Sequence, residues 1–138
     1  MTSKEMDAFK NRLKNYNYHQ DRINKIDEEL SLIHYEMVGV KGINFDYRVS
    51  STNIKLKDER KLELLEKHDS LVREKTEHIR ELDKLNRMLI QTELYRSQLI
   101  IEKYVNKRTY SQLSKKYHMA VSVIKYNIDK AMRSIEYI

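Results

Sequence analysis

The chain has 138 residues, no Pro, only two Gly and 35% charged residues, so it lacks the turn residues that an all-β fold needs and an all-α fold is predicted. Because it has no Cys, disulfides and thiolate metal sites are excluded. No apolar run is long enough for a signal peptide or a membrane span, so we expect a cytoplasmic protein without a membrane partner. The net charge of +6, from 27 basic and 21 acidic residues, favours a polyanionic partner.

The first predicted helix covers about residues 3–38. Its apolar residues recur at spacings of three, four and seven, as they do on one narrow face of an amphipathic helix. Polar residues interrupt the pattern at residues 17–21, where we expect a bend or a thinner contact, and Gly39 is expected to end the helix. The apolar face consists of Met6, Phe9, Leu13, Tyr16, Ile23, Ile26, Leu30, Ile33 and Met37.

Residues 39–57 are predicted to form a long loop, because they hold both glycines and a Ser/Thr/Asn cluster and show no helical period. The apolar residues of this loop need cover, which the end of a helical hairpin would give. Disorder is the alternative, because loops of this length are usually either functional or disordered.

The second predicted helix covers about residues 58–89 and carries apolar residues in columns at spacing seven, which is the pattern of a coiled coil. We expect it to fold back on the first helix, so that residues 1–90 form a long antiparallel hairpin. Its apolar surface is wide enough for two neighbours, which favours a homodimer. The predicted oligomerisation residues are Leu64, Leu65, Leu71, Val72, Ile79, Leu82 and Leu85.

Residues 91–138 are predicted to form a small helix-turn-helix domain of three short helices. A break at residues 105–108 ends the first helix, and Thr109 and Gln112 form a capping box that starts the second. The second helix must turn at residues 117–119, and the third begins at Ala120. The predicted core consists of Leu99, Ile100, Tyr104, Leu113, Ile124 and Ile128.

In a helix-turn-helix, the last helix enters the major groove of double-stranded DNA, so its outward residues are the candidates for reading base edges. Basic residues around it are the candidates for holding phosphates. The predicted base-reading residues are Val121, Ser122, Lys125 and Tyr126. The predicted phosphate contacts are Arg108, Thr109, Lys115, Lys116, Lys130 and Arg133.

Two parts of the chain resemble known families. The runs Tyr104–Ser114 and Met119–Lys125, together with Lys130 and Ala131, resemble the C-terminal promoter-reading domain of sigma factors. The segment Gly39–Asp46, followed by Val49–Ser51, resembles the linker of RinA/ArpU-like phage and prophage regulators of Gram-positive bacteria. This resemblance implies a transcriptional activator of late phage genes that acts in the bacterial host cell, with RNA polymerase as a candidate partner.

The chain departs from the sigma-like pattern at two positions. Ala120 stands where a capping Ser or Thr is usual, and the loss of such a cap costs about 1 kcal/mol unless Ser122 or a phosphate replaces it. His118 stands where the turn often has Gly or Asn, and His tolerates a positive φ better than most residues.

The sequence shows no pattern of catalysis. The five His include no pair at i and i+4, and there is no Gly-rich phosphate loop, so no enzyme, metal or cofactor is predicted. Two other functions stay open. Phage small terminase subunits also combine a helix-turn-helix with oligomerising helices for DNA packaging, although they commonly place the DNA module first. The third class is a protein-interaction or inhibitor protein that works through the hairpin.

Overall fold

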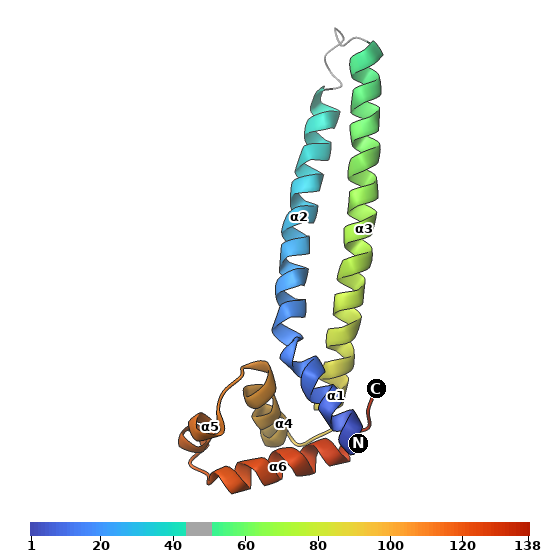
Figure 1. The fold of residues 1–138 in the computed structure, drawn as a ribbon. Helices are drawn as coiled ribbons and strands as arrows, with labels where there is room; N and C mark the ends of the chain where they lie inside the picture. Colours follow the sequence, from blue (N-terminus) through green and yellow to red (C-terminus); the bar gives the residue numbers. More distant parts are fainter. Residues whose placement is uncertain (44–50) are drawn as a thin grey trace. The chain divides into compact units, whose positions relative to one another are not determined.

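The computed structural model describes the backbone of residues 1–43 and 51–138 and the side chains of residues 1–38 and 58–138. Within these ranges every regular element is a helix, as the composition predicts (Figure 1). The elements are α1 (Ser3–Lys14), α2 (Tyr16–Ile43), α3 (Ser51–Leu89), α4 (Leu94–Ile100), the π-helical turn η1 (Ile101–Val105), α5 (Tyr110–Tyr117) and α6 (Val121–Ser134). None of the helices described is long and apolar enough to cross a membrane.

The first predicted helix is divided into α1 and α2 at Asn15, a few residues before the expected bend. A capping box starts α1: the Thr2 hydroxyl accepts a 3.2 Å hydrogen bond from the Glu5 N–H, and the Glu5 carboxylate accepts a 3.0 Å bond from the Thr2 N–H. Asn15, at φ −93° and ψ 2°, leaves the helical conformation and ends α1. The direction of the chain therefore changes before the polar interruption that the sequence pattern indicated.

Gly39 does not end the helix, because α2 continues to Ile43, and α3 already begins at Ser51. One glycine costs a helix only about 1 kcal/mol, which neighbouring turns offset. Helix α2 thus ends five residues beyond the predicted end at residue 38, and α3 begins seven residues before the predicted start at residue 58. The part of the predicted loop at residues 44–50, with its alternatives of packing or disorder, lies outside the described residues.

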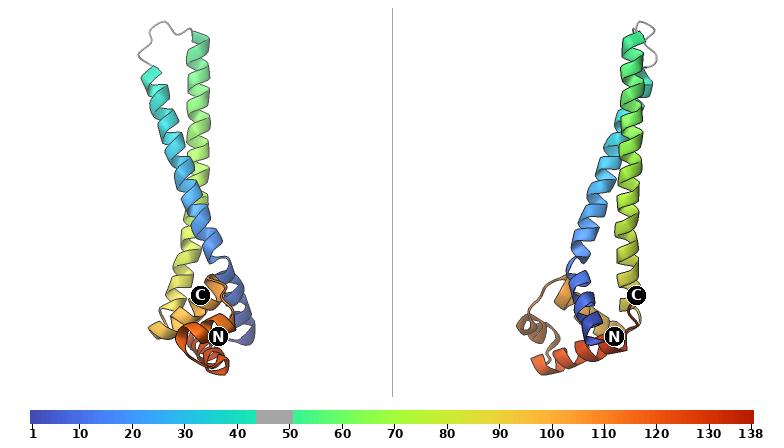
Figure 2. Two further views of the ribbon diagram at one scale, coloured as in Figure 1. Left: turned by 90° about the vertical axis from the view of Figure 1, so that its left-hand side faces the viewer. Right: turned by 45° about the vertical axis from the view of Figure 1, so that its right-hand side comes forward.

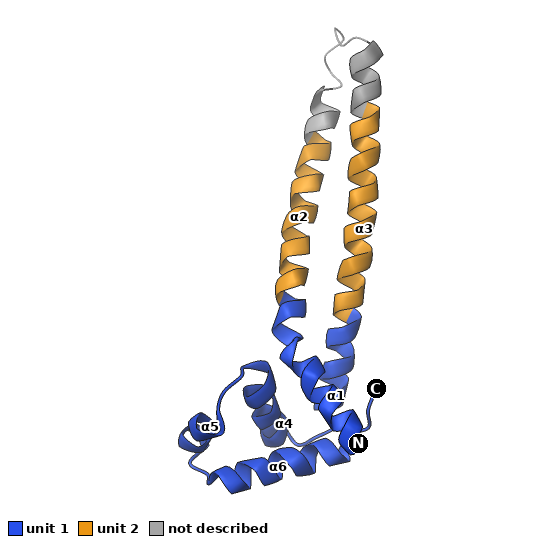
Figure 3. Cartoon of the chain, viewed as in Figure 1, with its two compact units in different colours: residues 1–20, 80–138 blue, residues 21–79 orange. Residues whose placement is uncertain are grey.

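The contacts divide the chain into two compact units, shown in Figure 3. Unit 1 consists of residues 1–20 and 80–138, and unit 2 consists of residues 21–79. This division differs from the predicted domains 1–90 and 91–138. The reason is that α1 and the last turns of α3 share a core with the C-terminal helices.

In unit 2, α2 and α3 lie side by side and run in opposite directions (Figures 1 and 2). Arg22 pairs with Glu74 at 2.6 Å, and Glu36 pairs with Arg60 at 2.6 Å. Ion pairs at or near the surface contribute up to about 1 kcal/mol each, so burial of apolar side chains supplies most of the stabilisation. The buried residues between the two helices are Ile26, Ile33, Leu64 and Leu71.

In unit 1, α1 packs with the end of α3 and with α4, η1, α5 and α6 around one apolar core. Phe9 and Leu13 of α1 are fully buried in it. All six residues of the predicted C-terminal core are buried as well, which confirms that part of the sequence analysis. The buried residues are Met6, Phe9, Leu13, Leu85, Met88, Leu89, Leu99, Ile100, Tyr104, Val105, Leu113, Ile124, Ile128, Ala131, Met132 and Ile135.

Candidate nucleic-acid interface

The start of α5 is fixed by the predicted capping box. The Thr109 hydroxyl accepts a 3.1 Å hydrogen bond from the Gln112 N–H, and the Gln112 amide oxygen accepts a 3.0 Å bond from the Thr109 N–H. Leu113 is fully buried, so it anchors α5 to the core of unit 1. Lys115 and Lys116 lie in the last turn, where positive charge is favoured by the helix dipole. This short helix therefore presents two exposed cations at a fixed position.

The turn between α5 and α6 depends on His118 and Ser114. His118 is left-handed, at φ 53° and ψ 43°, which confirms the positive φ considered from the sequence. Its N–H donates to the Ser114 carbonyl oxygen, and the Ser114 hydroxyl donates a 2.6 Å bond to the Met119 carbonyl oxygen. The turn is thus closed from both sides, and it sets the direction in which α6 leaves.

Helix α6 begins after Ala120, whose side chain makes no capping hydrogen bond, as expected. One face of the helix is buried in the core, with Ile124 fully covered. All four predicted base-reading residues are exposed. Ser122 and Tyr126, the latter 61% exposed, lie on the face opposite the core, whereas Val121, 36% exposed, and Lys125 lie closer to the buried side. The exposed face of α6 is therefore available to a partner.

Lys125 lies at the edge of this face, beside α5. Its ammonium is 5.0 Å from the centroid of the Tyr110 ring, and the ammonium of Lys103 is 4.1 Å from the same ring. The ammonium of Lys10 in α1 lies 5.8 Å from the centroid of the Tyr104 ring. The pKa of Tyr104 is raised by burial and by the neighbouring Tyr110. The sequence pattern did not reveal Lys10 and Lys103, because their proximity depends on tertiary packing.

The predicted phosphate contacts fall into different settings. Arg108 and Lys116 both pair with Glu102, which the sequence analysis missed, at 2.5 and 3.3 Å. Thr109 is exposed, with its hydroxyl in the capping box. Lys115 and Lys130 are exposed, and the Lys130 ammonium is 5.7 Å from the Tyr126 ring centroid.

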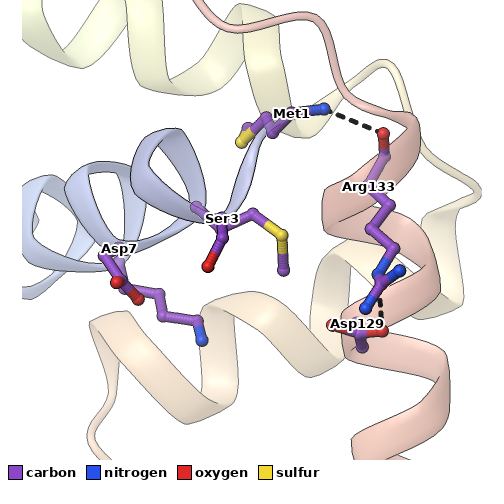
Figure 4. Close-up of a pocket in the computed structure, with 7 residues that line it drawn as sticks. Met1, Ser3, Asp7, Asp129 and Arg133 are labelled. Atoms are coloured by element: carbon purple, nitrogen blue, oxygen red, sulfur yellow. Dashed lines mark hydrogen bonds and ion pairs between the residues drawn. The ribbon is translucent and has the colours of Figure 1, made fainter.

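Arg133 faces a different environment, shown in Figure 4. Its guanidinium pairs with the Asp129 carboxylate at 2.9 Å, and its carbonyl oxygen accepts a 2.9 Å bond from the amino group of Met1. A pocket of about 440 Å³ lies here between α1 and α6. Its lining carries both signs of charge and consists of Met1, Ser3, Met6, Asp7, Lys10, Asp129 and Arg133. Arg133 is therefore already paired, unlike the exposed Lys115.

The N-terminal part of α4 contacts α6 at Asn127. Arg96 donates a 3.3 Å hydrogen bond to the side-chain oxygen of Asn127, a buried residue of α6. Exposed apolar side chains accompany this contact, including Leu94 at 75% and Val123 at 44%. These residues showed no distinct signal in the sequence, because they fit the general period of short amphipathic helices.

The predicted oligomerisation residues separate into buried and exposed groups. Leu64 and Leu71 pack against α2 of the same chain, and Leu85 is part of the core of unit 1, so these three are covered by their own chain. Leu82 is partly buried. The other three form an outer stripe on α3 at spacing seven: Leu65 at 40% exposed, Val72 at 39% and Ile79 at 46%.

The part of the chain with described side chains contains no cluster of three His, Asp or Glu residues arranged as metal ligands. Comparison of the chain with protein-family models, curated proteins and solved structures finds no match.

Proposed function

We propose that the chain is a sequence-specific DNA-binding protein, in which α5, the turn at His118 and α6 act as a helix-turn-helix and α6 enters the major groove. The observation that carries the proposal is the pairing of two features. The turn is held by the left-handed His118 and by the Ser114 hydroxyl, and the helix after it keeps an exposed face whose first turns carry the candidate base-reading residues. Fixed geometry and an accessible face are both needed to read base edges.

The exposed residues divide the work in this proposal. Ser122 and Tyr126 lie on the outward face of α6 and would meet base edges, while Val121 adds an apolar contact at the start of the helix. Lys115 and Lys130 would hold phosphates on either side of the groove. Lys125, beside the Tyr110 ring, would approach the backbone or the groove edge rather than its centre.

The regulatory part of the proposal rests on the resemblance to RinA/ArpU-like regulators. In that setting the protein would activate late phage genes, with RNA polymerase as a further partner. The antiparallel pair α2 and α3 would form the hairpin of the proposed architecture. A second copy would bind the outer stripe of α3, formed by Leu65, Val72 and Ile79. The resulting homodimer would present two reading helices to a two-fold symmetric DNA site.

One observation favours a second candidate, a protein-interaction module. Leu94, Tyr95, Val123 and Tyr126 are large side chains that stay 42–75% exposed around the junction of α4 and α6. Exposed apolar groups of this kind often mark a protein contact. Binding to such a partner would depend little on salt, whereas binding to DNA weakens steeply as salt rises.

The test of the proposed function is fluorescence anisotropy of the full chain with random double-stranded DNA at two salt concentrations, followed by selection from a random DNA pool. We expect binding that weakens with salt and enrichment of one sequence motif. The charge-reversing pair Lys115→Glu and Lys116→Glu should abolish binding. The matched pair Lys61→Glu and Lys67→Glu in unit 2 changes the net charge equally and should leave most of it. Absence of binding at low salt would refute the proposal.

A further inference from the structure

The side chain of Glu102 lies between two of the candidate phosphate contacts. Its Oε2 atom is 2.5 Å from Arg108 Nε, and its Oε1 atom is 3.3 Å from Lys116 Nζ. The Glu102 side chain is 14% exposed, whereas the Arg108 and Lys116 side chains are 46% and 45% exposed. A largely covered carboxylate therefore holds two cations that remain open to solvent on their outer sides.

The carboxylate is not needed to hold the segment before α5 in place. The Arg108 N–H donates a 3.0 Å hydrogen bond to the Glu102 backbone carbonyl oxygen, and Lys103 donates a 3.4 Å bond to the Arg108 carbonyl oxygen. Asn106 donates a 3.2 Å bond to Glu102 Oε1, which an amide oxygen would accept equally well. The negative charge of Glu102 is thus directed at Arg108 and Lys116 rather than at the fold of the segment.

A DNA phosphate that binds Arg108 or Lys116 must compete with this carboxylate. The Oε2 atom is buried and accepts no hydrogen bond, so Arg108 reaches it as an ion pair only. If Arg108 turns to a phosphate, Oε2 loses this cation as well, which is costly for a charge shielded from water. If the pair stays intact, the phosphate approaches a fixed negative charge, which is unfavourable as well. Both routes weaken binding to the DNA backbone.

We propose that Glu102 is an intramolecular competitor of DNA phosphate, a positioning residue that holds Arg108 and Lys116 and lowers the affinity of the chain for DNA of any sequence. This inference rests on the proposed function and describes how the DNA affinity of the same surface is set. Its effect is electrostatic and independent of base sequence, because phosphate contacts carry no sequence information directly.

The test compares Glu102→Gln with Glu136→Gln, an exposed residue near the end of the described chain, in binding to one random duplex over a series of salt concentrations. Both variants raise the net charge by one. Glu102→Gln should tighten binding about three- to eight-fold near 0.1 M salt and steepen the salt dependence by about one unit, as expected for one more cation free to displace counterions. Glu136→Gln should change the affinity less than about two-fold.

The tighter DNA binding expected of Glu102→Gln depends on Arg108 and Lys116. In a chain that already carries Arg108→Gln and Lys116→Gln, Glu102→Gln should therefore give no tighter binding. A second comparison does not depend on the folding of the Glu102 variant. Lys116→Gln should weaken DNA binding less than Lys115→Gln does, because Glu102 already offsets the charge of Lys116.

The outcomes distinguish the two proposals. If the unsubstituted chain binds DNA and Glu102→Gln binds equally or more weakly, this inference fails while the proposed function stands. A loss from Lys116→Gln as large as that from Lys115→Gln overturns it too. If the unsubstituted chain binds no double-stranded DNA, both proposals fail.

Discussion

The hydroxyl of Ser114 donates a 2.6 Å hydrogen bond to the carbonyl oxygen of Met119, across the turn that joins α5 to α6. The Ser114 carbonyl oxygen in turn accepts a 3.3 Å bond from the Met119 N–H. One residue thus satisfies a donor and an acceptor on the far side of the turn. The direction of α6, and with it the position of its exposed face, depends on this pair of bonds.

Replacement of Ser114 by Ala should therefore destabilise the chain by about 1 kcal/mol, because the Met119 carbonyl oxygen loses a donor in a partly buried place. Urea-induced unfolding followed by circular dichroism measures this change. Ser111→Ala is the matched control, since Ser111 lies exposed on the same helix. Equal effects of the two substitutions would show that the turn does not depend on the Ser114 hydroxyl.

The ion pair of Arg12 and Glu81 gives a prediction on pH. Arg12 Nε and Nη2 donate bonds of 2.6 and 3.0 Å to the two Glu81 oxygens, and the side chains are 20% and 25% exposed. These bonds lower the pKa of Glu81. A carboxylate with a lowered pKa stabilises the fold above its unfolded pKa, about 4.3, and loses that contribution as the pH falls through its folded pKa.

We expect Glu81→Gln to lower the free energy of unfolding by about 1 to 2 kcal/mol at pH 7 and by progressively less below about pH 4.3. Thermal unfolding over a series of pH values measures the difference. Glu77→Gln is the control, because Glu77 is exposed one turn away. A difference that stays constant from pH 7 to acid pH would contradict the assignment.

Local features of the fold could be predicted from the sequence, but the partners of the helices could not. The capping box of Thr109 and Gln112 and the left-handed His118 follow from residue types over a few positions. The apolar face of α1, by contrast, predicts only that something covers it. Phe9 lies in the core of unit 1 because of contacts with residues more than 70 positions away, which periodicity does not encode.

This shared core predicts that the C-terminal helices depend on the rest of unit 1. Residues 91–138 expressed alone should show no cooperative thermal transition, because the cover from Phe9, Leu13 and Met88 is missing. In the full chain, Phe9→Ala should cost about 3 to 5 kcal/mol, whereas Leu32→Ala, at a position 70% exposed, should cost little. A fragment that melts cooperatively near the temperature of the full chain would contradict this dependence.

The sequence predicts which residues of α6 are exposed in the candidate site, but it does not predict the ion pairs formed there. Exposure at Ser122 and Tyr126 follows from the helical period once the buried residues of α6 are known. The pairing of Arg108 and Lys116 with Glu102 depends on the path of the chain through η1 and through Lys107, which has a positive φ of 57°. A positive φ at a lysine carries no clear sequence signal, since Lys is not among the residues enriched there.

Self-association through the outer stripe of Leu65, Val72 and Ile79 can be tested by measuring the molecular mass in solution. The double variant Val72→Glu and Ile79→Glu should be monomeric in light scattering at micromolar concentration while the unsubstituted chain is dimeric, because each change places a charge in the proposed contact. Leu32→Glu with Tyr35→Glu, at positions 70% and 83% exposed on α2, adds the same charge elsewhere and should stay dimeric. A monomeric unsubstituted chain would remove the proposed dimer.

The last prediction separates backbone contacts from base contacts. Lys115 lies in the last turn of α5, the helix that crosses the DNA backbone in the proposed arrangement, whereas Tyr126 lies on the outward face of α6 at 61% exposure. Lys115→Ala should weaken binding to selected and random DNA by the same factor and reduce the salt slope by about one. Tyr126→Ala should cost about 1 to 3 kcal/mol on the selected sequence and much less on random DNA, because a lost base-edge contact affects sequence choice.

Anisotropy titrations with both DNAs at two salt concentrations measure these changes. Lys67→Ala, an exposed lysine of unit 2, is the charge control and should alter neither affinity by more than about two-fold. Equal losses on both DNAs from Tyr126→Ala would make Tyr126 a backbone contact. If neither Lys115→Ala nor Tyr126→Ala weakens binding, DNA does not contact the face formed by α5 and α6, since a surface that holds phosphates and reads bases must respond to both changes.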